Sequence, residues 1–122
     1  MKNLVSIIEI PVNNLGRSID FYEALLEVSL EEVEMEGAAM GVFPVEEGGV
    51  SVVLIRSDGY TPGTAGALIY LNAGDDLQPI LDKIEGLGGA VQVPKTLIDP
   101  EMGYFAVFTD SEGNKMGLHS AG

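Results

Sequence analysis

The sequence has no cysteine, only one histidine and only six basic residues among its 122. Without cysteine the chain can form no disulfide, thiolate metal site or cysteine nucleophile, which suits a reducing cytoplasm. Residues 1–12 hold one lysine and a short apolar run that Glu9 and Pro11 interrupt. This run is too short for a signal peptide or a membrane span. We therefore expect a cytoplasmic protein without a membrane partner.

The few basic residues stand against 19 Asp and Glu, which gives a net charge of -13. Such a surface repels a phosphate backbone, so nucleic acid is not an expected partner. It attracts cations, although an acidic surface also simply keeps a protein soluble. No P-loop, dinucleotide fingerprint or GxSxG nucleophile motif is present. An apolar share of 46% is enough for the core of one domain over residues 1–122.

Apolar periodicity divides the chain into strands and two helices. The expected strands are 4–12, 30–35, 39–45, 50–55, 67–72, 90–98, 103–109 and 115–119. The expected helices run from Asn13 or Asn14 to about Leu26, and over 75–87. The order strand, helix and three strands thus occurs twice, in a module of about 1–56 and another of about 67–122. Residues 57–66 form the expected linker between the modules, because of their Gly, Pro, Ser and Asp content.

The two modules can be aligned through their hairpins. In each one an aromatic residue, Phe43 or Phe108, precedes a Glu-Gly turn by the same spacing. The strands that follow these turns, and the strands that precede the helices, are then matched position by position. The matched pairs are Ile7 with Leu68, Glu9 with Tyr70, Val52 with Gly117, and Leu54 with His119.

Two segments, IEIPVNNLGRSIDFYEALL near the start and FTDSEGNKMGLHS near the end, resemble the vicinal oxygen chelate superfamily of glyoxalases, bleomycin resistance proteins and dioxygenases. The resemblance spans nearly the whole chain. It implies an α+β fold in which two βαβββ modules form a curled mixed sheet around a shared cup. It also implies a small-molecule ligand inside the cup and a homodimer as the usual assembly.

In the metal-dependent members of this superfamily, the resemblance implies one His, Gln or Glu ligand from the first and last strand of each module. By the alignment above, these positions hold Ile7, Val52, Leu68 and Gly117. None of the four side chains offers a donor to a cation, and a two-residue shift to Glu9 would recover only one ligand. We therefore expect no metal and no cofactor, and neither glyoxalase I nor dioxygenase activity of the metal-dependent kind.

Two residues beyond each lost ligand lie Glu9, Leu54, Tyr70 and His119, which by strand alternation should face the cup as well. In a dry cup, Glu9 could act as a general base, with His119 or Tyr70 as its proton partner. Structural roles are the alternative. Glu9 would then pair with His119 or face water, His119 would lie at the surface or a dimer contact, and Tyr70 would be a pocket wall.

Three hypotheses about function follow. The first is a metal-free protein that binds a small, partly apolar and perhaps cationic molecule in the cup, as bleomycin resistance proteins sequester an antibiotic. Its ligand-binding residues would be Tyr70, Ile7, Val52, Leu54, Leu68 and Gly117. The second is a lyase or isomerase that acts next to a carbonyl with Glu9 and His119, or a metal-dependent enzyme with ligands elsewhere. The third is a dimeric interaction module whose cup is filled by its own side chains.

Overall fold

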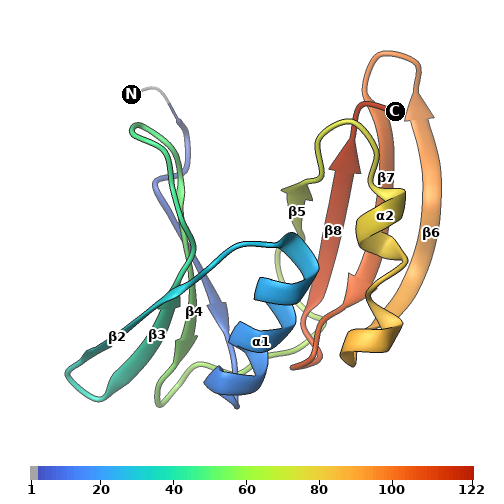
Figure 1. Ribbon diagram of the computed structural model, residues 1–122. Coiled ribbons are helices and arrows are strands. Elements are labelled where there is room, and N and C mark those ends of the chain that lie inside the picture. Colours follow the sequence, from blue (N-terminus) through green and yellow to red (C-terminus); the bar gives the residue numbers. More distant parts are fainter. Residues whose placement is uncertain (1–2) are drawn as a thin grey trace. The chain divides into compact units, whose positions relative to one another are not determined.

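The computed structural model describes residues 3–122, which form two compact units, residues 3–62 and 63–122. Each unit contains one four-stranded mixed sheet, with strand orders β1-β4-β3-β2 in the first unit and β5-β8-β7-β6 in the second. In each unit a helix follows the first strand and three strands follow the helix (Figure 1). The predicted α+β fold of two βαβββ modules is thus confirmed.

The elements of the first unit are β1 (Ile7–Pro11), α1 (Leu15–Leu26), β2 (Glu31–Met35), β3 (Ala38–Val42) and β4 (Ser51–Arg56). The helix begins where predicted, because the Asn14 side chain accepts a hydrogen bond of 3.0 Å from the backbone N–H of Arg17. It ends at Leu26, before Glu27, which has a left-handed backbone.

Apolar side chains of α1 pack against one face of the first sheet. Ile10 and Leu54 point to this face and are 2% and 0% exposed. Gly41 lies beside Leu54, and a Cβ there would be 2.9 Å from Cγ1 of Ile19, so the absence of a side chain lets the helix approach the strand. Tyr22 adds an edge-to-face contact with Phe43, with ring centroids 5.6 Å apart.

The second unit contains β5 (Ile69–Asn72), α2 (Gln78–Leu81), the short 3-10 helix η1 (Glu85–Leu87), β6 (Ala90–Asp99), β7 (Gly103–Thr109) and β8 (Lys115–Ser120). The predicted helix over 75–87 is therefore broken into two short pieces. Its predicted inward side chains are nevertheless buried: Leu77 and Ile84 are 0% exposed and Leu81 is 5% exposed. Pro79 in the first turn and Gly86 within η1 explain the short segments, because neither residue favours a helix interior.

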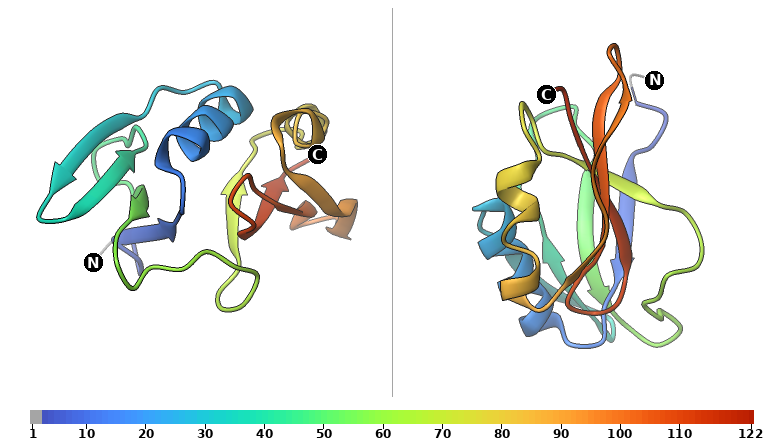
Figure 2. Two further views of the ribbon diagram at one scale, coloured as in Figure 1. Left: turned by 90° about the horizontal axis from the view of Figure 1, so that it is seen from below. Right: turned by 90° about the vertical axis from the view of Figure 1, so that its right-hand side faces the viewer.

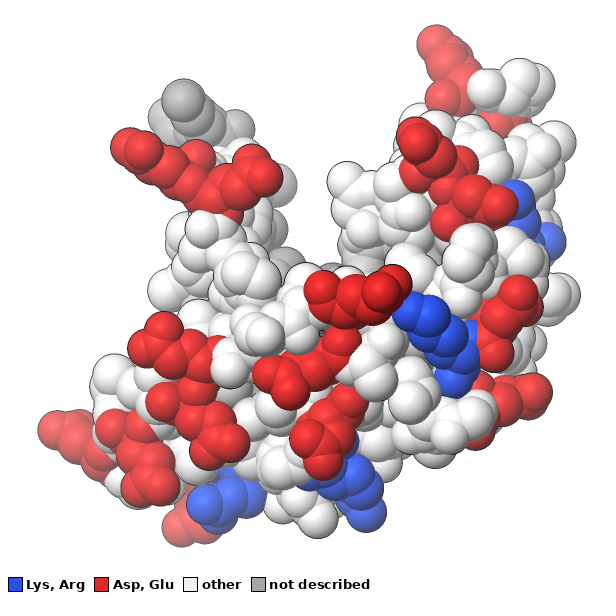
Figure 3. Space-filling view, in the orientation of Figure 1, with Lys and Arg blue, Asp and Glu red and all other residues white. Residues whose placement is uncertain are grey.

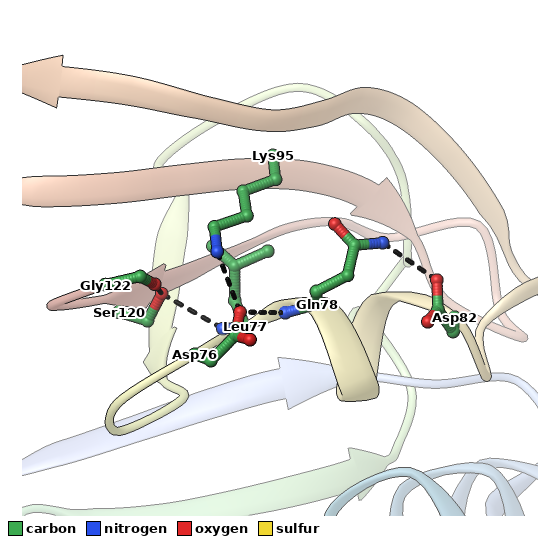
Figure 4. A network of polar contacts seen from close by, with 7 residues as sticks. All are labelled: Asp76, Leu77, Gln78, Asp82, Lys95, Ser120 and Gly122. Atoms are coloured by element: carbon green, nitrogen blue, oxygen red, sulfur yellow. Dashed lines mark hydrogen bonds and ion pairs between the residues drawn. The ribbon is translucent and has the colours of Figure 1, made fainter.

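The helix α2 lies beside the second sheet (Figure 2), and polar contacts attach its N-terminal end to that sheet (Figure 4). The buried Ser120 hydroxyl accepts a hydrogen bond of 3.0 Å from the backbone N–H of Leu77 and donates one to the carbonyl of Gly122. On β6, Lys95 forms an ion pair of 2.8 Å with Asp76 at the start of the helix. The side chains of Ser120 and Lys95 therefore define the face of the sheet that α2 covers.

Candidate functional site

The face of the second sheet opposite α2 carries a row of aromatic and polar side chains. Tyr70 on β5 pairs with Gly117 on β8, and Phe105 on β7 pairs with His119 on β8. These residues alternate with Ser120 and Leu118, which point to the α2 side, so their side chains share the open face. The strand register and the period-two alternation of side chains together bring Tyr70, Phe105 and His119 to one face.

A pocket of about 500 Å³ opens on this face. It is lined by Tyr70, Ile98, Met102, Phe105 and His119, all of them from the second unit. Tyr70, Ile98 and Met102 are large apolar or aromatic side chains, yet they are 47%, 43% and 56% exposed. A concave cluster of apolar side chains with few polar groups is the usual form of a small-molecule site.

Two aromatic rings shape the pocket. The rings of Tyr70 and Phe105 meet edge to face, with centroids 6.4 Å apart and planes inclined at 72°. The Tyr70 ring also lies directly over Gly117, so that a Cβ on this glycine would be 2.7 Å from Cε2 of the ring and closer still to Cδ2. The ring thus occupies the volume that any side chain at position 117 would need.

His119 is held by the tip of the β6–β7 hairpin. Its Nε2 atom lies 2.6 Å from the carbonyl oxygen of Met102. The tip is itself fixed by Asp99, whose Oδ1 accepts hydrogen bonds from the backbone N–H groups of Glu101 and Met102. The imidazole is therefore tied to a structured turn, although it stands only three residues from the end of the sequence.

In the first unit, Ile7 and Glu9 are exposed on the face of the sheet away from α1. The parallel register pairs Ile7 with Ser51 and Glu9 with Val53. Val52 and Leu54 pair instead with Ile8 and Ile10 and point toward α1, where Leu54 is fully buried. The prediction that Val52 and Leu54 share a face with Ile7 and Glu9 is therefore wrong by one residue.

The cause is the length of the hairpin that connects β3 to β4. Val42 pairs with Val53, whereas Val107, the equivalent residue in the second unit, pairs with Gly117. The partner in the first unit thus lies one residue further along the chain, and a shift of one residue turns every side chain to the other face. The first-unit counterpart of Gly117 is therefore Val53 rather than Val52, and its side chain is aliphatic as well.

Glu9 has a partner that the sequence patterns did not indicate. The hydroxyl of Tyr60, from the segment after β4, donates a hydrogen bond of 3.0 Å to Oε1 of Glu9. This hydrogen bond and the charge of the Glu9 carboxylate raise the pKa of Tyr60, so its hydroxyl keeps its proton. Glu9 is exposed rather than desolvated in the structure. The predicted pairing of Glu9 with His119 joins residues of different units and stays a prediction.

The remaining predicted ligand position, Leu68, is partly buried and lies just before β5 begins. Among residues 3–122, no cluster of three or more His, Asp or Glu side chains is placed to hold a metal ion. At position 117 the Tyr70 ring leaves no room for a ligand side chain. The residues present do not fit the metal of the metal-dependent members.

The turn between β7 and β8 carries part of the resemblance, and its polar residues have structural partners. Asp110 is buried, and its Oδ1 accepts hydrogen bonds from the backbone N–H groups of Glu112 and Asn114. Asn114 in turn accepts one from the backbone N–H of Gly63. These bonds satisfy the buried carboxylate and close the turn, which accounts for Asp110 and Asn114 without a role in chemistry.

The charge distribution does not single out a site. On the face that Figure 3 shows, Asp and Glu side chains are spread over each unit, with a few Lys and Arg side chains among them. The pocket lined by Tyr70 and His119 contains no charged carboxylate among its lining residues. Within the part of the chain that the structure describes, no helix has the length and hydropathy needed to cross a membrane.

Comparison with known proteins agrees with the fold. Residues 4–118 match the family model of the Glyoxalase/Bleomycin resistance protein/Dioxygenase superfamily, and the chain belongs to this superfamily. A comparison with the sequences of curated proteins gives no match.

Several solved structures are similar to this protein over almost the whole chain. A glyoxylase/bleomycin resistance protein/dioxygenase domain from a Frankia species superposes with a TM-score of 0.76 at 16% identity, covering 98% of this chain and 92% of that one. The antibiotic-binding protein TnmS3 from a Streptomyces species gives 0.71 at 24% identity, with 98% of both chains covered. The fosfomycin resistance protein FosX from Listeria monocytogenes gives 0.68 at 17% identity, covering 98% and 94%. At these identities the likeness establishes the fold alone.

Proposed function

We propose that this chain is a small-molecule-binding protein that holds a partly apolar ligand without a metal ion. The observation that carries the proposal is the apolar pocket on the second sheet, where the Tyr70 ring covers Gly117. The pocket is open and of a size suited to a small organic molecule. The antibiotic-binding neighbour TnmS3 supports a binding role for a chain of this fold.

Native mass spectrometry of freshly purified protein tests the absence of metal and the presence of a ligand together. We expect no stoichiometric zinc, nickel or iron, and we expect added apolar aromatic compounds to bind. Tyr70→Ala should weaken that binding about tenfold, because it removes a wall of the pocket. The matched control is Tyr104→Ala, which removes another tyrosine of the second sheet, next to Lys95 and outside this pocket. Stoichiometric metal, or equal effects of the two substitutions, would contradict the proposal.

An enzyme that uses Glu9 as a general base is the second candidate. The hydrogen bond from Tyr60 favours it, because this bond places a protonated hydroxyl 3.0 Å from the carboxylate. The substrate class would be a compound with an acidic proton next to a carbonyl group. Glu9→Gln should then abolish turnover and leave ligand affinity nearly unchanged. Loss of both together would favour the binding protein.

Three further points of the proposal rest on sequence. The superfamily resemblance supports a homodimer, which sedimentation velocity measures directly. The net charge of -13 favours a cationic ligand over an anionic one. The absence of cysteine supports a cytoplasmic location. An interaction module without a ligand is less well supported, because the pocket on the second sheet is not filled by its own side chains.

A further inference from the structure

The hydrogen bond between His119 and Met102 determines which imidazole nitrogen is protonated. A carbonyl oxygen can only accept a hydrogen bond, so Nε2 of His119, at 2.6 Å from it, must carry the hydrogen. A neutral imidazole has one N–H group, and Nδ1 is therefore an acceptor. Among residues 3–122, Nδ1 has no hydrogen-bond partner. The pocket thus contains an acceptor that is available to a ligand.

The other lining groups indicate the shape of that ligand. Tyr70 and Phe105 meet at 72° and form a corner in which a planar ring can stack on one aromatic face and present its edge to the other. The thioether of Met102 and the side chain of Ile98 complete an apolar lining that adapts to such a ring. The lining contains no Asp, Glu, Lys or Arg side chain.

We propose that the pocket binds a planar aromatic molecule that carries a hydroxyl or N–H group, and that this group donates a hydrogen bond to Nδ1 of His119. The inference rests on the proposed small-molecule-binding function and specifies its ligand class. An aromatic compound with only acceptor groups would place a lone pair against the lone pair of Nδ1. Discrimination between the two kinds of compound follows from the tautomer that Met102 imposes.

The test compares β-naphthol with its methyl ether, which has the same rings but no donor. Titrations followed by ligand-detected NMR, on protein without a histidine tag, measure both dissociation constants. We expect β-naphthol to bind roughly three- to tenfold more tightly, the usual range for one hydrogen bond. In His119→Phe, which keeps an aromatic ring but has no acceptor, both compounds should bind with nearly equal affinity. The ratio of the two dissociation constants is compared between wild-type protein and His119→Phe. Any steric effect of the methyl group enters both ratios and therefore cancels.

The single histidine allows a second test that needs no substitution. Proton–nitrogen correlation spectra should show the Nε2–H tautomer in the free protein, and β-naphthol should shift the Nδ1 signal. A protonated Nδ1, or equal affinities of wild-type protein for the two compounds, would overturn this inference and leave the proposed function standing. If neither compound binds, or if Tyr70→Ala binds both as well as the wild type does, the proposed function fails as well.

Discussion

Gly117 and Tyr70 depend on each other, because the ring of one fills the space beside the other. Gly117→Ala would place a methyl group 2.7 Å from Cε2 of Tyr70, so the ring must turn away from the strand. We expect a loss of unfolding free energy of about 1 kcal/mol, at the low end for overpacking, because Tyr70 is 47% exposed and its displaced ring would move toward solvent rather than into the core. Binding of β-naphthol should weaken more clearly, since the pocket loses a wall. Urea unfolding and NMR titration measure the two effects.

Gly86→Ala is the matched control for this substitution. A Cβ at Gly86 meets no other atom within 4 Å, and this residue lies in η1, outside the pocket. Its affinity for β-naphthol should equal that of the wild type. Unchanged affinity in Gly117→Ala would mean that the Tyr70 ring does not form the pocket wall described here.

Two buried serines offer a comparison of a satisfied and an unsatisfied hydroxyl. Ser120 is 1% exposed and accepts the N–H of Leu77, whereas Ser18 is 0% exposed and, among residues 3–122, its Oγ has no partner. Ser120→Ala should lower the free energy of unfolding by about 1–2 kcal/mol, because it leaves a buried N–H unpaired. Ser18→Ala should be neutral or stabilising. Urea unfolding of both variants decides, and an equal loss in the two would contradict the structure.

At the scale of elements, the start of α2 is attached to β6 by a charge pair. Lys95 donates to Asp76, and the backbone N–H of Gln78 donates to the same carboxylate (Figure 4). The hydrogen bond from Lys95, followed by that from Gln78, lowers the pKa of Asp76 below its usual 3.8. A lowered pKa in the folded state means that the contribution to stability is complete above pH 3.8 and disappears as the pH falls below it.

Asp76→Asn tests this contribution. The variant should lose stability relative to the wild type at neutral pH, and the two unfolding free energies should converge as the pH falls through and below 3.8. Lys95→Gln is the companion variant, because it removes the largest cause of the lowered pKa of Asp76. The same substitution also removes the cation that lies 4.7 Å from the ring centroid of Tyr104. A constant difference between wild type and Asp76→Asn at all pH values would exclude this explanation.

The sequence predicts elements best where local chemistry decides them. β7 has the predicted bounds, and Asn14, one of the two predicted capping residues, caps α1, because strand alternation and a capping side chain are local signals. The helix over 75–87 was predicted too long, since the buried pattern of Leu77 and Ile84 persists through a segment that is only partly helical. Packing of the apolar side chains, not helix propensity, fixes that segment.

The site could be predicted in part. Tyr70 and His119 were named from the repeat, and the structure places both in one pocket. Phe105 lies on the same face and directly opposes His119, so strand alternation could also have predicted it as a pocket residue. Ile98 lies near the end of β6 and Met102 in the turn that follows, whose conformation depends on the Asp99 contacts and leaves no periodic pattern. Non-local register likewise explains why Val52 and Leu54 were assigned to the wrong face.

At the scale of the whole molecule, the net charge of -13 is the dominant electrostatic property. Like charges repel more strongly in the compact state than in the unfolded chain, so screening should stabilise the fold. Raising sodium chloride from a few millimolar to about 0.15 M should increase Tm by a few degrees, as measured by calorimetry. Potassium chloride should give the same curve if screening is the cause. A Tm that does not change with salt would contradict this expectation.

The contact between Tyr70 and Gly117 also constrains how this chain can evolve. A substitution that introduces a His, Gln or Glu side chain at position 117 meets the Tyr70 ring, so it brings disruption of the pocket before it brings any metal affinity. Replacement of Tyr70 alone opens the pocket and supplies no ligand. A ligand side chain at position 117 therefore requires a change at position 70 as well, so one substitution cannot turn this strand into a metal-binding strand.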